Sequence, residues 1–175
     1  CESHGVQFQN KKVGTFGDIS NFSFYFGHHI TTIEGGMVCT NSDDLYDMAK
    51  MYRSHGMTRD ASPSVRKQYE KEYPELNPLF TFVVPGFNLR STEINAVIGL
   101  EQLPKLDDIV DKRTDNLKTW LENLSSSVFN TDYELEGSSN FSLPLILKNP
   151  DKPLFLAICK HLSDQKVEFR KGTAG

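Results

Sequence analysis

The densest group of chemically active side chains lies in residues 22–36. Ser23 precedes the pair His28 and His29 by five residues, and two threonines and a Glu-Gly-Gly turn follow the pair. Hydroxyl groups and exposed backbone N–H groups at the end of a strand can bind a phosphate. A histidine beside such a phosphate can transfer protons near neutral pH. The pattern therefore predicts a phosphate site served by an imidazole. The alternative is a polar turn that carries two surface histidines.

The segments around this group alternate between strand and helix patterns. Residues 6–9 and 18–26 are predicted to be strands, and 37–40 form a short apolar run after two glycines. Ser42 is placed to cap a helix whose apolar residues follow helical spacing and which would end at Gly56. The order strand, strand, helix indicates an α/β fold.

The middle of the chain begins with an irregular stretch. Residues 57–90 contain four prolines and many charges, and loops of this length are usually functional. Ser91 is expected to cap the next helix. Pro104 fits the first turn of a longer helix, whose apolar stripe extends to Leu124. We therefore expect two consecutive helices after the irregular stretch.

The C-terminal part returns to an alternating order. Residues 141–147 alternate between apolar and other side chains, as in a strand with one buried face. A helix is predicted over 152–164, and 167–170 would begin another strand. A shift in composition suggests a domain boundary, with residues 1–104 in one domain and 105–175 in a second.

The composition is that of a folded protein. A hydrophobic fraction of 38% supplies a core, and a net charge of −4 gives no basic surface for nucleic acid or a membrane. No apolar stretch approaches the ~18 residues of a membrane span. The cysteines Cys1, Cys39 and Cys159 form neither a metal motif nor a disulfide framework, so a reducing, cytoplasmic compartment is expected. Because the chain has no initiator Met and closes on no element, we expect an internal piece of a longer protein.

Five segments resemble, in the same order, the DegT/DnrJ/EryC1/StrS sugar aminotransferase superfamily. These are pyridoxal-phosphate enzymes that act on nucleotide-linked 4-keto sugars. The segments are residues 3–5, 14–18, 22–36, 53–56 and 86–103. The resemblance implies a partial type I PLP-dependent transferase fold (α/β, aspartate aminotransferase-like), made of the second half of the large domain and the start of the small C-terminal domain. It also implies a homodimer with sites at the subunit interface.

The chain departs from the family pattern at one position. Where the aminotransferases carry the lysine that forms a Schiff base with pyridoxal phosphate, this sequence has His28. The change resembles the 3-dehydratases of nucleotide-linked 4-keto-6-deoxy sugars, which act in deoxysugar and lipopolysaccharide biosynthesis. The resemblance implies that pyridoxamine phosphate condenses with the C4 ketone and that His28 takes the proton from the cofactor methylene. The 3-hydroxyl then leaves, and glutamate regenerates the amine form.

The same resemblance assigns further residues. Ser23 would contact the cofactor phosphate, Asn88 would reach the phosphate in the partner subunit's site, and Glu2 stands where aminotransferases often carry a glutamine against the ring hydroxyl. His29 is expected to make a structural or substrate contact and not to act as the base. A related branch uses an iron–sulfur cluster, which needs several cysteines. Only Cys1 matches that branch, so no iron–sulfur cluster is expected.

Two other functions stay open at this point. One is a sugar 4-aminotransferase of the same superfamily, in which another group replaces the lysine. The other is a catalytically inactive fragment or homologue. The histidines outside the pair, His4, His55 and His161, are expected to be ordinary core or surface residues.

Overall fold

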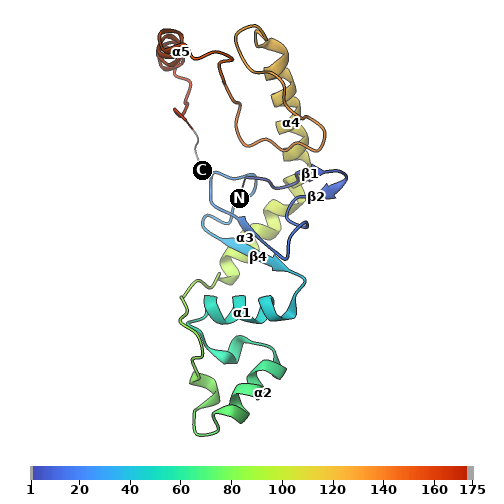
Figure 1. Ribbon diagram of the computed structural model, residues 1–175, viewed down its shortest axis with the longest axis vertical. Coiled ribbons are helices and arrows are strands. Elements are labelled where there is room, and N and C mark those ends of the chain that lie inside the picture. Colours follow the sequence, from blue (N-terminus) through green and yellow to red (C-terminus); the bar gives the residue numbers. More distant parts are fainter. Residues whose placement is uncertain (1, 173–175) are drawn as a thin grey trace. The chain divides into compact units, whose positions relative to one another are not determined.

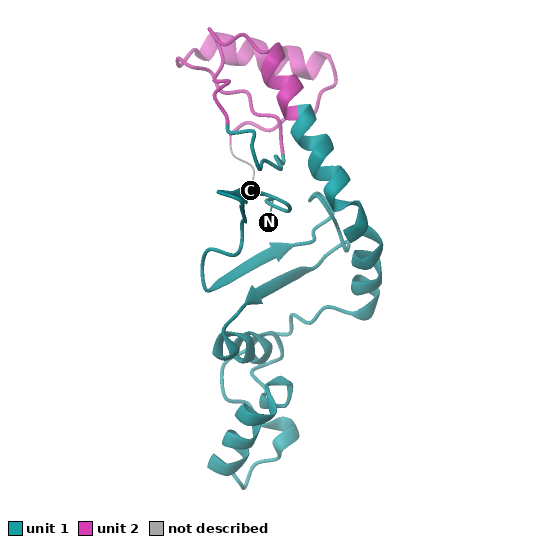
Figure 2. Cartoon of the chain, turned by 90° about the vertical axis from the view of Figure 1, so that its right-hand side faces the viewer, with its two compact units in different colours: residues 1–116, 134–141 teal, residues 117–133, 142–175 magenta. Residues whose placement is uncertain are grey.

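The computed structural model describes residues 2–172 (Figure 1). The chain divides into two compact units (Figure 2). The first unit comprises residues 1–116 and 134–141, and the second comprises residues 117–133 and 142–175. Cys1, on which the iron–sulfur expectation depends, lies outside the described residues. The predicted division after residue 104 concerns the domains of the whole fold, so it stays a prediction.

Two antiparallel ribbons form the N-terminal part of the first unit. The first pairs β1 (Gln7–Phe8) with β2 (Lys11–Lys12), and the second pairs β3 (Ile19–Ser23) with β4 (Gly36–Thr40). The β3–β4 register places Ser23 opposite Gly36. The connecting residues 24–35 therefore form a closed loop whose two ends meet. The strand predicted over 18–26 is shorter in the structure, because its pairing with β4 ends at Ser23 and Gly36.

Helix α1 (Asp43–Arg53) follows β4 and confirms the predicted cap. The hydroxyl of Ser42 accepts a hydrogen bond from the N–H of Leu45 in the first turn. Two aspartates in the same turn interact favourably with the positive end of the helix dipole. The C-cap is Ser54, two residues before the predicted Gly56. Gly56 has a φ of 81°, and a side chain there would collide with a backbone carbonyl. Gly56 is therefore needed for the left-handed turn that follows the helix, although it is not the C-cap.

The proline-rich stretch is more regular than its sequence suggested. It contains α2 (Pro63–Glu72) between two 3₁₀ turns, η1 (Thr58–Asp60) and η2 (Pro78–Phe80). The expectation of an irregular loop was wrong here, because Pro63 occupies the first turn of α2, where its missing N–H costs nothing. Asp47 of α1 fixes the start of α2, since its carboxylate accepts the N–H and the hydroxyl proton of Ser62 at 2.6 and 2.7 Å.

Helix α3 (Glu93–Gln102) begins one residue later than predicted, because Thr92 and not Ser91 is its N-cap. Thr92 and Asn95 cap each other reciprocally in a capping box. A serine and a threonine stand side by side in this sequence, and only the box partner three residues on distinguishes them.

The two long helices are joined by a short turn. Pro104 lies in η3 (Leu103–Lys105), which leads directly into α4 (Leu106–Asn123). The helix ends just before the predicted serine stop, so this part of the prediction is confirmed. None of the helices in residues 2–172 is long and apolar enough to cross a membrane.

The second unit contains α5 (Lys152–Asp164), which matches the predicted helix. The predicted strands over 141–147 and 167–170 are not formed. One isolated bridge between Phe129 and Leu147 is all that pairs the first of them among the described residues. Alternating side chains favour extended backbone, but a strand also needs a neighbour to accept its hydrogen bonds.

The buried apolar core is small in both units. Ile30, Met51, Met57 and Ala61 are buried in the first unit, and Leu117 and Cys159 are buried in the second. Large apolar side chains on β4 and α3 remain exposed, among them Met37, Val38, Ile94 and Val97.

Candidate functional site

His28 lies in the loop between β3 and β4, five residues after Ser23, with which β3 ends. Its Nδ1 is 3.3 Å from the main-chain carbonyl oxygen of Ser23. Because a carbonyl oxygen only accepts, Nδ1 carries the proton and Nε2 of the neutral ring carries the lone pair. The rings of Tyr25 and Phe141 stand edge-on to the imidazole, with centroids 5.8 and 5.9 Å away. His28 is half-buried, so Nε2 can act as a base toward a ligand.

His29 has a different environment although it is the next residue. It is 4% exposed, and its Nε2 lies 3.1 Å from the carbonyl oxygen and 2.9 Å from the hydroxyl of Ser139. Burial lowers the pKa of His29, and the charge of Arg113 adds to this, against the opposing effects of the Ser139 hydrogen bond and Glu2. A buried, neutral ring tied to the main chain is a structural contact, as the sequence suggested, and is poorly placed to act as a base.

His4 completes a cluster of three imidazoles, His4, His28 and His29, which we call the histidine cluster. His4 is 4% exposed, and its ring centroid is 5.5 Å from that of His29 and 6.5 Å from that of His28. The rings of Phe22 and Phe24 flank it at 5.6 and 5.8 Å. Within residues 2–172, neither ring nitrogen has a hydrogen-bond partner. Burial, together with His29 and His28, lowers the pKa of His4 from 6.5 to about 4.

The structure brings three of the four predicted site residues into one region. Ser23 is half-buried and contacts His28 through its carbonyl, and its hydroxyl oxygen accepts the N–H of Tyr25 at 3.3 Å. Glu2 is half-buried, and its charge acts on His29. Asn88 is not part of this region. It is exposed, forms a backbone bridge to the end of α1, and accepts a hydrogen bond from the neighbouring arginine at 3.3 Å.

Sequence reasoning missed the residues that reach the histidine cluster from far along the chain. Ser139 binds His29 across 110 residues, and Phe141 packs against His28. Arg113 of α4 donates to the carbonyl of Phe141 at 3.0 Å. The predicted domain boundary places residues 134–141 in the second domain, and only Phe141 of them belongs to a predicted strand. No residue motif marks this segment, so only the tertiary structure could place it here.

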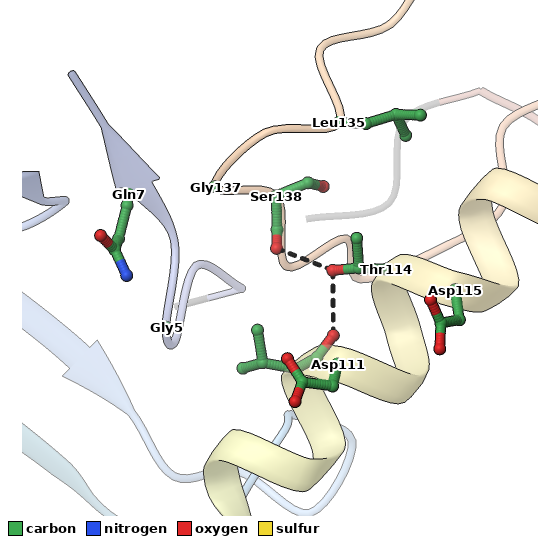
Figure 3. A pocket seen from close by; sticks show the side chains of 9 residues that line it. Gly5, Gln7, Asp111, Thr114, Asp115, Leu135, Gly137 and Ser138 are labelled. Carbon is green, nitrogen blue, oxygen red and sulfur yellow. Dashed lines mark hydrogen bonds between the residues drawn. The ribbon is translucent and has the colours of Figure 1, made fainter. Parts of the chain in front are cut away.

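A separate pocket of about 400 Å³ opens between the start of the chain, α4 and the segment near Ser138 (Figure 3). Oγ1 of Thr114 lies there within hydrogen-bond distance of two main-chain carbonyl oxygens, 3.0 Å from that of Val110 and 2.9 Å from that of Ser138. The carboxylates of Asp111 and Asp115 line the opening. Two acidic side chains repel a phosphate, so this pocket does not fit the predicted phosphate site.

The family pattern of DegT/DnrJ/EryC1/StrS aminotransferases matches residues 1–171. The chain belongs to this family. The resemblance noted from the motifs is thereby confirmed, and the histidine cluster lies in two of the segments that carried it, 3–5 and 22–36.

Relatives of known name in this family include both dehydratases and aminotransferases. GDP-4-keto-6-deoxy-D-mannose 3-dehydratase of Yersinia pseudotuberculosis is 35% identical over 176 residues, which cover 100% of this chain and 45% of the relative. GDP-perosamine synthase of Escherichia coli O157:H7 is 38% identical over 128 residues, which cover 73% of this chain and 30% of the relative. The chain therefore spans less than half the length of these relatives.

A solved structure supports the fold assignment. The E. coli GDP-4-keto-6-deoxy-D-mannose-3-dehydratase with bound hydrated PLP superposes with a TM-score of 0.80 at 31% identity. The match covers 96% of this chain and 43% of that one. The predicted partial PLP-dependent transferase fold is confirmed.

Proposed function

We propose that the protein carrying this chain catalyses the C3 deoxygenation of a nucleotide-linked 4-keto-6-deoxy sugar, with pyridoxal or pyridoxamine phosphate as its cofactor. The observation that carries the proposal is the hydrogen bond between Nδ1 of His28 and the carbonyl of Ser23, because it leaves Nε2 as a free base where aminotransferases carry a lysine. The 35% identity to a 3-dehydratase over the full chain supports the same reaction.

The residues around His28 fit a phosphorylated pyridine cofactor. The hydroxyl of Ser23 accepts the N–H of Tyr25, and in the described part of the chain its own proton donates to no protein atom, so it is available to a phosphate oxygen. Glu2, whose charge acts on His29, would approach the ring hydroxyl. Asn88 is exposed and would serve the neighbouring subunit of a homodimer.

The reaction divides between the cofactor and the protein. When bound, the cofactor supplies a primary amine for the C4 ketone and a ring that accepts electrons. Nε2 of His28 takes up one proton and can return it to the departing 3-hydroxyl, which makes water the leaving group. The carbonyl of Ser23 keeps the imidazole in the tautomer that this transfer needs. Buried His29 takes no part in the proton transfer.

A product assay tests the proposal. The full-length protein is incubated with GDP-4-keto-6-deoxymannose, glutamate and pyridoxal phosphate, and the product is analysed by mass spectrometry and NMR. We expect a 3-deoxy sugar. A 4-amino sugar would establish the aminotransferase alternative, which the 38% identity to GDP-perosamine synthase favours. If neither product forms, the remaining alternative is a catalytically inactive homologue.

Two substitutions test the role of His28. We expect His28→Asn to lower kcat by on the order of 10²–10⁴-fold, as for loss of a general base. His55→Asn is the matched control, since His55 is exposed and its φ of 62° suits asparagine. We also expect His28→Lys, but not Gly27→Lys, to give a visible absorption band with pyridoxal phosphate. Equal behaviour of the two lysine variants would contradict the site assignment.

A further inference from the structure

The loop that follows the histidine pair contains an unfavourable backbone conformation. Ile33 has a φ of 75°, in the left-handed region that β-branched residues avoid. Its side chain is 63% exposed, so burial of that side chain does not offset the cost. The conformation is held instead by hydrogen bonds from side chains to the main chain of the turn.

Two of these hydrogen bonds are local, since the hydroxyl of Thr31 accepts the N–H of Ile33 at 2.9 Å and that of Thr32 donates to the carbonyl of Glu34 at 2.9 Å. The others come from α3. Nδ2 of Asn95 donates to the carbonyl of Thr32 at 2.9 Å and to the carbonyl of Glu34 at 3.0 Å, one residue on each side of Ile33. The opposite end of the same amide acts on its own helix, because Oδ1 accepts from the N–H of Thr92 at 3.1 Å and from its hydroxyl at 2.6 Å. Carbonyls can only accept and an N–H can only donate, so the orientation of the amide is fixed.

Residues 31 and 32 of this turn are hydrogen-bonded to Phe24, the residue that follows β3. The N–H of Thr32 donates to the carbonyl of Phe24 at 2.9 Å, and the hydroxyl of Thr31 donates to the same oxygen at 3.1 Å. Phe24 follows Ser23, whose carbonyl fixes Nδ1 of His28. Hydrogen bonds and the peptide link between Ser23 and Phe24 therefore connect the amide of Asn95 with the carbonyl that orients His28.

We propose that Asn95 is a positioning residue, which holds the turn 31–34 in its strained conformation and so orients His28. This inference rests on the proposed function of His28 for its kinetic consequence, but the restraint of the turn itself does not. The oxygen of the amide caps α3 and the nitrogen restrains the turn, so the two roles can be separated by substitution.

The decisive variant is Asn95→Asp in the full-length protein. Aspartate keeps Oδ1, the acceptor that caps α3. Its second carboxylate oxygen replaces the donor Nδ2 and would face the two carbonyl oxygens of the turn without a proton to share. We expect kcat to fall about tenfold or more while KM for the sugar nucleotide changes less than threefold, because a small misplacement of the base affects the chemical step. Amide hydrogen exchange should accelerate over residues 24–35 and stay unchanged over residues 97–102.

Thr92→Val is the matched control, because it removes the capping hydroxyl and leaves Nδ2 of Asn95 in place. We expect it to speed exchange in the first turn of α3 and to leave kcat within about twofold. Ile33→Gly removes the strain, since glycine adopts a positive φ freely. The double variant with Asn95→Asp and Ile33→Gly should therefore regain most of the lost kcat.

A further variant keeps the proposal testable if Asn95→Asp does not fold. A side chain at Gly35 would collide with the hydroxyl of Thr32, so Gly35→Ala should disturb the same turn, with lower kcat and an intact α3. Identical effects of Asn95→Asp and Thr92→Val, or no rescue by Ile33→Gly, would overturn the proposal. Faster exchange in the turn without any 3-deoxy product from the wild-type protein would refute the proposed function and leave the restraint standing.

Discussion

Two regions of the first unit bury an ionisable side chain, and they satisfy it in opposite ways. At the start of α2, Asp47 is 5% exposed, and its two oxygens each accept a short hydrogen bond from Ser62. In the histidine cluster, His4 is 4% exposed, and neither ring nitrogen has a partner within residues 2–172. A buried carboxylate without donors is costly, whereas an imidazole can give up its proton and remain neutral.

The difference shows what each region does. The Asp47 contact joins α1 to the start of α2 and only supports the fold. In the histidine cluster, His4 is held by packing against Phe22 and Phe24. His28 and His29 are instead held by hydrogen bonds to Ser23 and Ser139. The following predictions test this contrast.

We expect the largest effect from acid acting on His4. Its pKa in the folded protein is about 4, below the ordinary 6.5, because the ring is buried beside His29 and His28. Between these pH values the unfolded chain binds a proton that the folded protein excludes, so stability falls as the pH falls from 6.5 to 4. The total is on the order of 3 kcal/mol at 1.36 kcal/mol per pKa unit. Unfolding of the wild type and of His4→Phe should be measured across this range, and parallel curves would contradict the prediction.

Asp47→Ala should cost about 2 kcal/mol, because it leaves the N–H and the hydroxyl of Ser62 without their charged acceptor. The free energy of unfolding measures the loss, and proteolysis should become faster near α2. Asp44→Ala on the same helix is the control, since Asp44 is exposed and should cost less than about 1 kcal/mol. Equal losses would mean that burial of Asp47 is irrelevant.

Ser139→Ala should cost about 1 kcal/mol, the net value of one buried hydrogen bond. His29 keeps the carbonyl of residue 139 as its acceptor, so the ring should hold its orientation. The comparison of thermal unfolding with kcat decides the outcome. If kcat falls as far as in His28→Asn, His29 is not merely structural.

The smallest effect is expected at the surface of α2. Arg66 and Glu70 form an ion pair at 3.5 Å, and both side chains are well exposed. We expect Arg66→Ala to cost less than about 0.5 kcal/mol, with the loss disappearing at high salt. A larger loss would show that α2 depends on more than the buried Asp47 contact.

Local signals predicted the fold only where the local chain decides the structure. Ser42 caps its helix as predicted, and α5 has the predicted first and last residues. Four prolines and many charges predicted an irregular stretch over 57–90, but Pro63 stands in the first turn of a helix. The alternating residues 141–147 were taken for a strand, but pairing depends on a neighbour that spacing cannot reveal.

The amino-acid sequence by itself determined the family and the position of the unusual imidazole, because both depend on the order of residues along short segments of the chain. Only the tertiary structure decided how His28 and His29 differ, since one carbonyl at Ser23 and one serine 110 residues away set their tautomers and their exposure. The role of Asn95 likewise follows from contacts across more than 60 residues. Hydrogen bonds between distant segments depend on the folded backbone, and no local pattern encodes them.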